Sequence, residues 1–139
     1  MSETSSGDLA PELTLLRLRD LRRGLLHLHK ALLDTERSAY EQVYGRVASG
    51  ELLQLVISHE QFAWLHTISE LIVCIDETLD ADEPVTTDEA ESLLAQARAL
   101  LKPSEAGGEF ERKYYVALQR EPAAVLAHRE VTLILSAGT

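Results

Sequence analysis

Residues 11–44 read PELTLLRLRDLRRGLLHLHKALLDTERSAYEQVY, and this stretch decides the fold. Leucines recur from Leu18 to Leu32 at alternating steps of three and four residues, which is the spacing of one face of an α-helix. The leading proline suits the first turn of a helix, and Gly45 suits a left-handed turn after its end. At about 1.5 Å per residue, the segment predicts a helix of roughly 50 Å. Gly24 lies inside it and indicates a bend or a close contact with another helix.

The rest of the chain repeats the helical spacing. Four further helices are predicted at residues 59–80, 87–101, 109–120 and 122–136, after a short apolar piece at residues 51–57. No sustained alternation of period two and no Asn-Gly hairpin turn is present. We therefore expect an all-α bundle of five or six helices with one long N-terminal helix. A disordered leader, residues 1–8, precedes a single domain, residues 9–139, in this interpretation.

Two residue pairs match the capping box, in which a Ser or Thr and an acid or amide three residues later bond each other's backbone N–H. Ser58 with Gln61 predicts that a helix begins near residue 59. Thr86 with Glu89 predicts the start of the next helix, with Thr87 as the alternative cap.

The composition excludes several classes of protein. Of 139 residues, 45% are hydrophobic and 26% are charged, so the chain can bury a core and is neither disordered throughout nor collagen-like. A formal charge of −10 argues against general binding to nucleic-acid phosphates. The apolar runs are too short to cross a membrane. Because we also find no secretory signal and only one cysteine, Cys74, we expect a cytoplasmic protein with Cys74 packed in its core.

Acidic and basic residues occupy different parts of the sequence. Residues 47–97 contain eleven acids and no Lys or Arg, whereas the first half of the long helix is net positive. Three interpretations remain open. The basic helix packs beside the acidic one and the charges cancel, or the charged residues form a docking surface for a partner, or the acidic segment is a solvated face.

His59, Glu60, His66 and Glu70 are the candidates for a metal or ligand site. His59 and His66 are seven residues apart, which is about 10 Å along a helix and too far for one ion. The spacing also differs from the i, i+4 histidine pair of helical zinc sites. We therefore expect no metal, no cofactor and no catalytic residue. The alternative function is a bundle that binds a metal ion or small ligand in an interior pocket lined by these four residues.

Arg112 and Lys113 directly precede two tyrosines, Tyr114 and Tyr115. One interpretation is an aromatic and basic surface for a nucleobase or a peptide. The other places one tyrosine in the core and the second at its rim.

Residues 62–77, FAWLHTISELIVCIDE, resemble a segment of a family of small, uncharacterised all-helical bacterial proteins. The resemblance extends over residues 25–135 and implies a free-standing bacterial helical domain. It implies no activity, and it assigns no functional residue.

These patterns predict a non-enzymatic protein that acts through protein–protein contacts. Its partner is a second copy, in a homodimer that buries part of the long helix, or another protein. The helical stripe is longer than the other helices can cover, the charge is two-sided, and catalytic motifs are absent. Arg and Trp are enriched at binding hot spots. The predicted interaction residues are Arg17, Leu18, Arg19, Leu21, Arg22, Arg23, Leu25 and Trp64. Trp64 suits a core position equally well.

Overall fold

The computed structural model describes residues 8–136, and within them the protein is all-α, as predicted. A 3₁₀ helix, η2 (Glu60–Leu65), directly precedes α3. The α-helices are α1 (Glu12–Tyr44), α2 (Ser49–Ser58), α3 (His66–Asp80), α4 (Thr87–Leu100), α5 (Glu109–Arg120) and α6 (Pro122–Ser136). The predicted leader lies outside the described residues except for Asp8.

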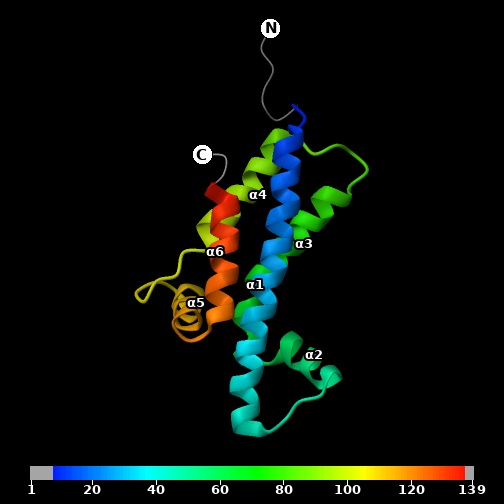
Figure 1. Cartoon of the computed structure of the whole chain (residues 1–139). Helices are drawn as coiled ribbons and strands as arrows, with labels where there is room; N and C mark the ends of the chain where they lie inside the picture. The colour runs from blue at the N-terminus through cyan, green and yellow to red at the C-terminus, as the bar shows by residue number, and fades with distance from the viewer. Residues whose placement is uncertain (1–7, 137–139) are drawn as a thin grey trace.

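The long helix α1 is the central element, and the other helices pack around it (Figure 1). Helix α6 runs antiparallel to α1 on one side, α3 lies on the other side, and α4 crosses behind them. Helix α1 has 33 residues and ends where Gly45 adopts a φ of 91°, so the predicted length and end are confirmed.

The apolar stripe of α1 forms the centre of the core. Its first five leucines have no exposed surface, and they pack with residues of η2, α3, α4, α5 and α6. These leucines are Leu18, Leu21, Leu25, Leu28 and Leu32. Helices with an apolar face this wide pack on several neighbours rather than on one partner helix.

Gly24 marks a close approach between α1 and α6. A β-carbon at this position would lie 2.9 Å from Cγ2 of Val131 and 3.5 Å from Cδ1 of Ile134. The absence of a side chain therefore lets the two helices pack closely, which confirms one of the two roles predicted for this glycine.

The segment before α1 is held to the loop between α3 and α4. The N–H of Ala10 donates to the carbonyl of Val85 at 2.9 Å, and the N–H of Thr87 donates to the carbonyl of Asp8 at 2.8 Å. Thr86 and Glu89 form the predicted capping box at the start of α4. These bonds fix the entry of the chain into α1.

The predicted helix at residues 59–80 divides into two elements. Residues 60–65 form η2, and the α-helix begins only at His66. In a 3₁₀ helix, residues three apart lie on one side, so Phe62 and Leu65 both reach the core. The predicted capping box at Ser58 is wrong, because its hydroxyl donates to the carbonyl of Gln54, and Nδ1 of His59 accepts the N–H of Gln61 instead.

The packed position predicted for Cys74 is also wrong, because its side chain is exposed. Leu71, Ile72 and Ile75 take the core face of α3, and the helical period turns residue 74 outward. Among the described residues, no helix is long and apolar enough to span a membrane.

Candidate functional site

The apolar row predicted as a contact surface lies inside the molecule. Leu18, Leu21 and Leu25 have no exposed surface, because the stripe that carries them faces the helices of the same chain. The prediction that these leucines contact a partner is therefore wrong. A period of 3.6 residues identifies the apolar face of a helix but not the molecule that covers it.

Trp64, the predicted aromatic anchor, is also a core residue. It is only 5% exposed, and its ring lies 5.5 Å from that of Phe110 between centroids. Its indole Nε1–H donates to Oε2 of Glu36 at 2.9 Å. Trp64 therefore links α1, η2 and α5, and its prediction as a surface anchor is wrong.

The predicted arginines lie at the surface, and three of them line a hollow of about 350 Å³ between α1 and α3. Arg22 forms an ion pair with Asp76 of α3, and Arg23 pairs with Asp20 at 3.3 Å. Arg19 lines the same hollow, whereas Arg17 lies outside it and is half-buried. The acidic and basic segments thus lie side by side here, in agreement with the first interpretation of the charge pattern.

Several large apolar side chains are exposed at the end of the molecule formed by residues 43–58. We call it the distal end; it contains the last turn of α1, the connecting turn and α2 (Figure 1). None of the residues of α2 is fully buried, although five of its ten are large and apolar. Leu53 and Ile57, one turn apart, are 58% and 60% exposed, and Val43 and Tyr44 are 73% and 67% exposed.

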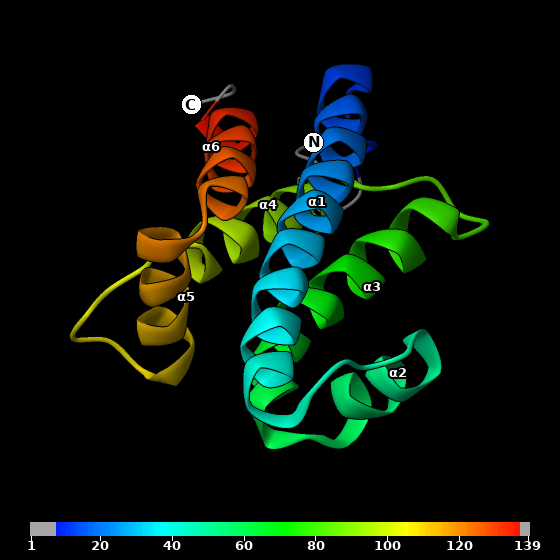
Figure 2. The ribbon, with the colours of Figure 1, turned by 60° about the horizontal axis from the view of Figure 1, so that its bottom comes forward.

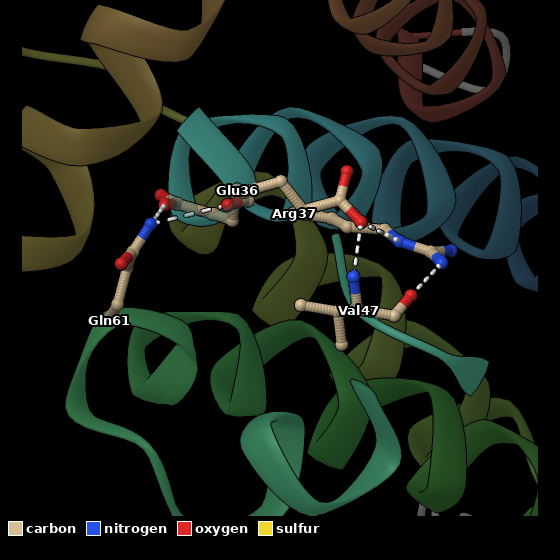
Figure 3. A network of polar contacts seen from close by, with 5 residues as sticks. Glu36, Arg37, Val47 and Gln61 are labelled. Carbon is tan, nitrogen blue, oxygen red and sulfur yellow. Dashed lines mark hydrogen bonds and ion pairs between the residues drawn. The ribbon is translucent and has the colours of Figure 1, made fainter. Parts of the chain in front are cut away.

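Polar contacts fix the position of the distal end relative to α1. The guanidinium of Arg37 donates to the carbonyl of Val47 at 2.6 Å, and the N–H of Val47 donates to Oε2 of Glu41 at 2.9 Å (Figure 3). Arg37 also pairs with Glu41 at 3.4 Å. The hydrogen bond from Val47 is the main cause that lowers the pKa of Glu41, and the charge of Arg37 acts in the same direction. We call Arg37, Glu41 and Val47 the turn network.

A second hollow, of about 340 Å³, lies between α1, η2 and α5, and we call it the α1–α5 hollow. Its lining combines three cations with one carboxylate and a small apolar floor. The lining residues are Thr35, Glu36, Ala39, Gln61, Arg112, Lys113, Val116, Ala117 and Arg120. Figure 2 shows α5 standing beside the lower half of α1.

Glu36 is held in this hollow by neutral donors. Gln61 donates from Nε2 to Oε1 of Glu36 at 3.0 Å and to its backbone carbonyl at 3.2 Å (Figure 3). Trp64 donates to the other carboxylate oxygen. The carboxylate is therefore fixed in place by two uncharged side chains.

The basic pair beside the two tyrosines divides between this hollow and the core. Arg112 and Lys113 line the hollow, Tyr114 has no exposed surface, and Tyr115 is partly exposed. The core-and-rim interpretation of the tyrosines is thus confirmed. The sequence carries one signal for this hollow: Lys113 and Arg120 are seven residues apart and share a face of α5, and Arg112 directly precedes Lys113.

Two histidines are buried enough to disfavour their charged forms. Burial lowers the pKa of His128, whose Nδ1 lies 2.5 Å from the hydroxyl oxygen of Tyr114. Burial, and to a smaller extent the charge of His66, lowers the pKa of His29, whose Nε2 lies 2.9 Å from Oγ of Ser69. Burial also raises the pKa of Tyr114, which favours the protonated form of its hydroxyl.

The four residues predicted as an alternative ligand site do not converge. His59 accepts the N–H of Gln61, His66 donates from Nε2 to the carbonyl of Val56 at 2.7 Å, and Glu60 and Glu70 are exposed. Residues 8–136 contain no group of three or more His, Cys, Asp and Glu side chains placed to hold a metal ion. The prediction of an interior pocket lined by these four residues is therefore wrong.

No protein-family model, no curated protein and no solved structure matches the chain. The arrangement of its own side chains is therefore the basis for assigning a function.

Proposed function

We propose that this protein is a non-enzymatic cytoplasmic helical protein that acts through protein–protein contacts, and that it forms a homodimer through its distal end. The observation that carries the proposal is α2, a helix with five large apolar residues of which none is fully buried. A helix of ten residues is marginal in water and depends on packing of its apolar face.

The charge of the protein favours a second copy as the occupant of this surface. Two copies of a chain with a formal charge of −10 repel each other over most approaches. Residues 43–58 contain one base, Arg46, and one acid, Glu51, so this end is formally neutral. The distal ends can therefore meet with little repulsion, and in a two-fold arrangement the same patch serves both copies.

The exposed area predicts a moderate affinity. Full burial of a Leu, Ile or Val side chain contributes about 1.5–3 kcal/mol, so covering side chains that are exposed by about 60–70% gains roughly 1–2 kcal/mol each. Four such residues on each copy give roughly 8–16 kcal/mol, against an association cost of about 4–15 kcal/mol. A dissociation constant in the micromolar range corresponds to about 8 kcal/mol, which lies within the difference between these two ranges, and we expect a dimer of this strength. The turn network supports this association, because a surface that is already ordered loses less entropy on binding.

Size-exclusion chromatography with light scattering tests the proposal over low to high micromolar concentrations. The wild type is expected to approach twice the 15.4 kDa chain mass as the concentration rises. The double variant Leu53→Glu/Ile57→Glu is expected to remain at the mass of one chain, with an unchanged helical signal in circular dichroism.

Leu126→Glu is the matched control, because Leu126 is at least as exposed as Leu53 and Ile57 but lies on α6, away from the distal end. This variant is expected to form dimers as the wild type does. A wild type that stays at 15.4 kDa throughout, or a dimer that survives the double variant, would show that the distal end is not a dimer interface.

A further inference from the structure

The α1–α5 hollow is a positively charged site on a negatively charged protein. Arg112, Lys113 and Arg120 contribute three positive charges to its lining, and Glu36 contributes one negative charge. Three cations against one carboxylate give the site a formal charge of +2, whereas the whole chain carries −10. A hollow of this sign attracts anions and concentrates their field between its walls.

The cations of this hollow are not neutralised across it. Arg112 donates to the carbonyl of Gly107, and Lys113 forms an exposed pair with Glu109 on its own helix. The guanidinium of Arg120 makes no hydrogen bond or ion pair with any residue in the range 8–136. Arg120 can therefore turn its full set of donors toward a ligand.

The hollow between α1 and α3 differs from the α1–α5 hollow in the pairing of its arginines. It also contains arginines, but Arg22 is paired there with Asp76 and Arg23 with Asp20. An anion would have to displace these carboxylates. In the α1–α5 hollow the carboxylate of Glu36 is bound by Gln61 and Trp64 instead. Lys113 pairs with Glu109 on its own helix, but Arg112 and Arg120 form no ion pair with a residue in the range 8–136.

The shape of the α1–α5 hollow fits a small organic molecule rather than a simple ion. Its volume of about 340 Å³ lies at the lower end of the range for small-molecule pockets, roughly 300–1,000 Å³. Ala39, Val116 and Ala117 supply an apolar surface between the charged groups. Arg112 and Arg120 are eight residues apart, which is about 12 Å along α5, so a ligand of several bonds is needed to contact both.

We propose that the α1–α5 hollow binds a small organic acid. Its two acidic groups, carboxylate or phosphate, pair with Arg112, Lys113 and Arg120, and its carbon skeleton lies on Ala39, Val116 and Ala117. The fixed carboxylate of Glu36 accepts a hydrogen bond from a hydroxyl or ammonium group of the ligand, and it repels a second acidic group placed next to it. Arginine is suited to both acidic groups because its planar guanidinium can bond two oxygens at once. This site is independent of the distal end.

Titration of the isotope-labelled protein, followed by two-dimensional amide NMR at constant ionic strength, tests the proposal. The probes are inorganic phosphate and malate, a dicarboxylate that carries a hydroxyl group, and chloride replaces them in the reference samples. Both probes are expected to give saturable shifts centred on residues 112–120, at concentrations up to about 10 mM. Malate is expected to bind more tightly, because it can use the apolar floor and Glu36 as well as the cations.

Substitutions that make the hollow more negative or less negative distinguish a specific binding site from general electrostatic attraction to the protein. Arg120→Ala is expected to weaken binding about tenfold or more, through the loss of one charge-assisted hydrogen bond. Val116→Glu is expected to weaken it by a similar factor, because it places a negative charge in the lining of the hollow. Both positions are exposed, so the fold should tolerate the changes. Glu36→Gln is expected to tighten phosphate binding, because it removes the one negative charge of the hollow and retains an oxygen that accepts from Trp64.

Arg129→Ala is the matched control, since it removes one positive charge from the exposed side of α6, outside this hollow. It is expected to change either affinity by less than about twofold. Shifts that do not saturate, or an equal effect of Arg120→Ala and Arg129→Ala, would overturn the proposal. Light scattering of the same samples reports dimer formation separately, so loss of ligand binding and loss of self-association can be told apart.

Discussion

The close approach of α1 and α6 at Gly24 allows the effect of one added methyl group to be predicted. In the interior of a helix, Gly→Ala ordinarily stabilises by about 1 kcal/mol, because alanine loses less backbone entropy. At residue 24 the new β-carbon would lie 2.9 Å from Cγ2 of Val131, closer than real β-carbons approach a neighbour. Val131 is fully buried and β-branched, so it has essentially one side-chain rotamer and cannot turn away.

The added methyl group must therefore push α6 away from α1. Overpacking of this kind costs about 1–3 kcal/mol, which exceeds or offsets the gain in helix propensity. We expect Gly24→Ala to lower the free energy of unfolding by about 0–2 kcal/mol.

Gly50 provides the matched control within the same chain. It lies in α2, and a β-carbon there would meet no atom within 4 Å. Gly50→Ala is therefore expected to stabilise by up to about 1 kcal/mol, so the two variants should differ by roughly 1–3 kcal/mol. Urea unfolding followed by circular dichroism measures this difference, and for a chain of this length it corresponds to roughly 3–4 °C in Tm per kcal/mol.

A double-mutant cycle identifies the clash as the cause. Val131→Ala alone should destabilise by leaving a cavity, but in the Gly24→Ala background the same change should cost about 1 kcal/mol less, because it also removes the clash. If Gly24→Ala raised the urea midpoint as much as Gly50→Ala does, the close packing of α1 on α6 would be refuted.

Two further predictions concern pH and helix capping. Burial lowers the pKa of His29 and of His128 from 6.5, so below pH 6.5 the unfolded chain binds more protons than the folded chain does. The urea concentration at the midpoint of unfolding should therefore decrease as the pH is lowered from about 7.5 to 5. A midpoint that does not change with pH would contradict this assignment. Thr86→Ala removes the side chain that caps α4 and should cost about 1 kcal/mol of unfolding free energy in the same assay, whereas Thr67→Ala, at an exposed position of α3, should cost nothing measurable.

Local signals in the sequence were enough to place most helices. The step of three and four residues gave the extent of α1, and Thr86 with Glu89 marked the start of α4. Each of these signals is a short-range effect of helix geometry, which is why it can be read without the rest of the fold.

The burial of a residue depends on which other elements pack against it, and this could not be predicted from local sequence patterns. Leu21 and Trp64 have the character of interaction residues, but α1 is surrounded by its own chain and both are buried. Cys74 sits in an apolar run and is nevertheless exposed, since Ile72 and Ile75 occupy the core face of α3. The α1–α5 hollow could not be inferred because its lining comes from three elements that are distant in sequence.

The mismatch in helix length explains why both proposed surfaces lie in the same half of the molecule. Helix α1 is about 50 Å long, whereas α3, α4 and α6, with 14 or 15 residues each, reach only about 22 Å. The stripe of α1 is fully buried as far as Leu32, but further along the same stripe Ala39 and Val43 are exposed. Beyond Leu32 the cover consists of short elements, α2, η2 and α5, and the surfaces they leave open are the distal end and the α1–α5 hollow. Both surfaces therefore arise because the apolar stripe of α1 extends beyond the longer helices that cover its first part.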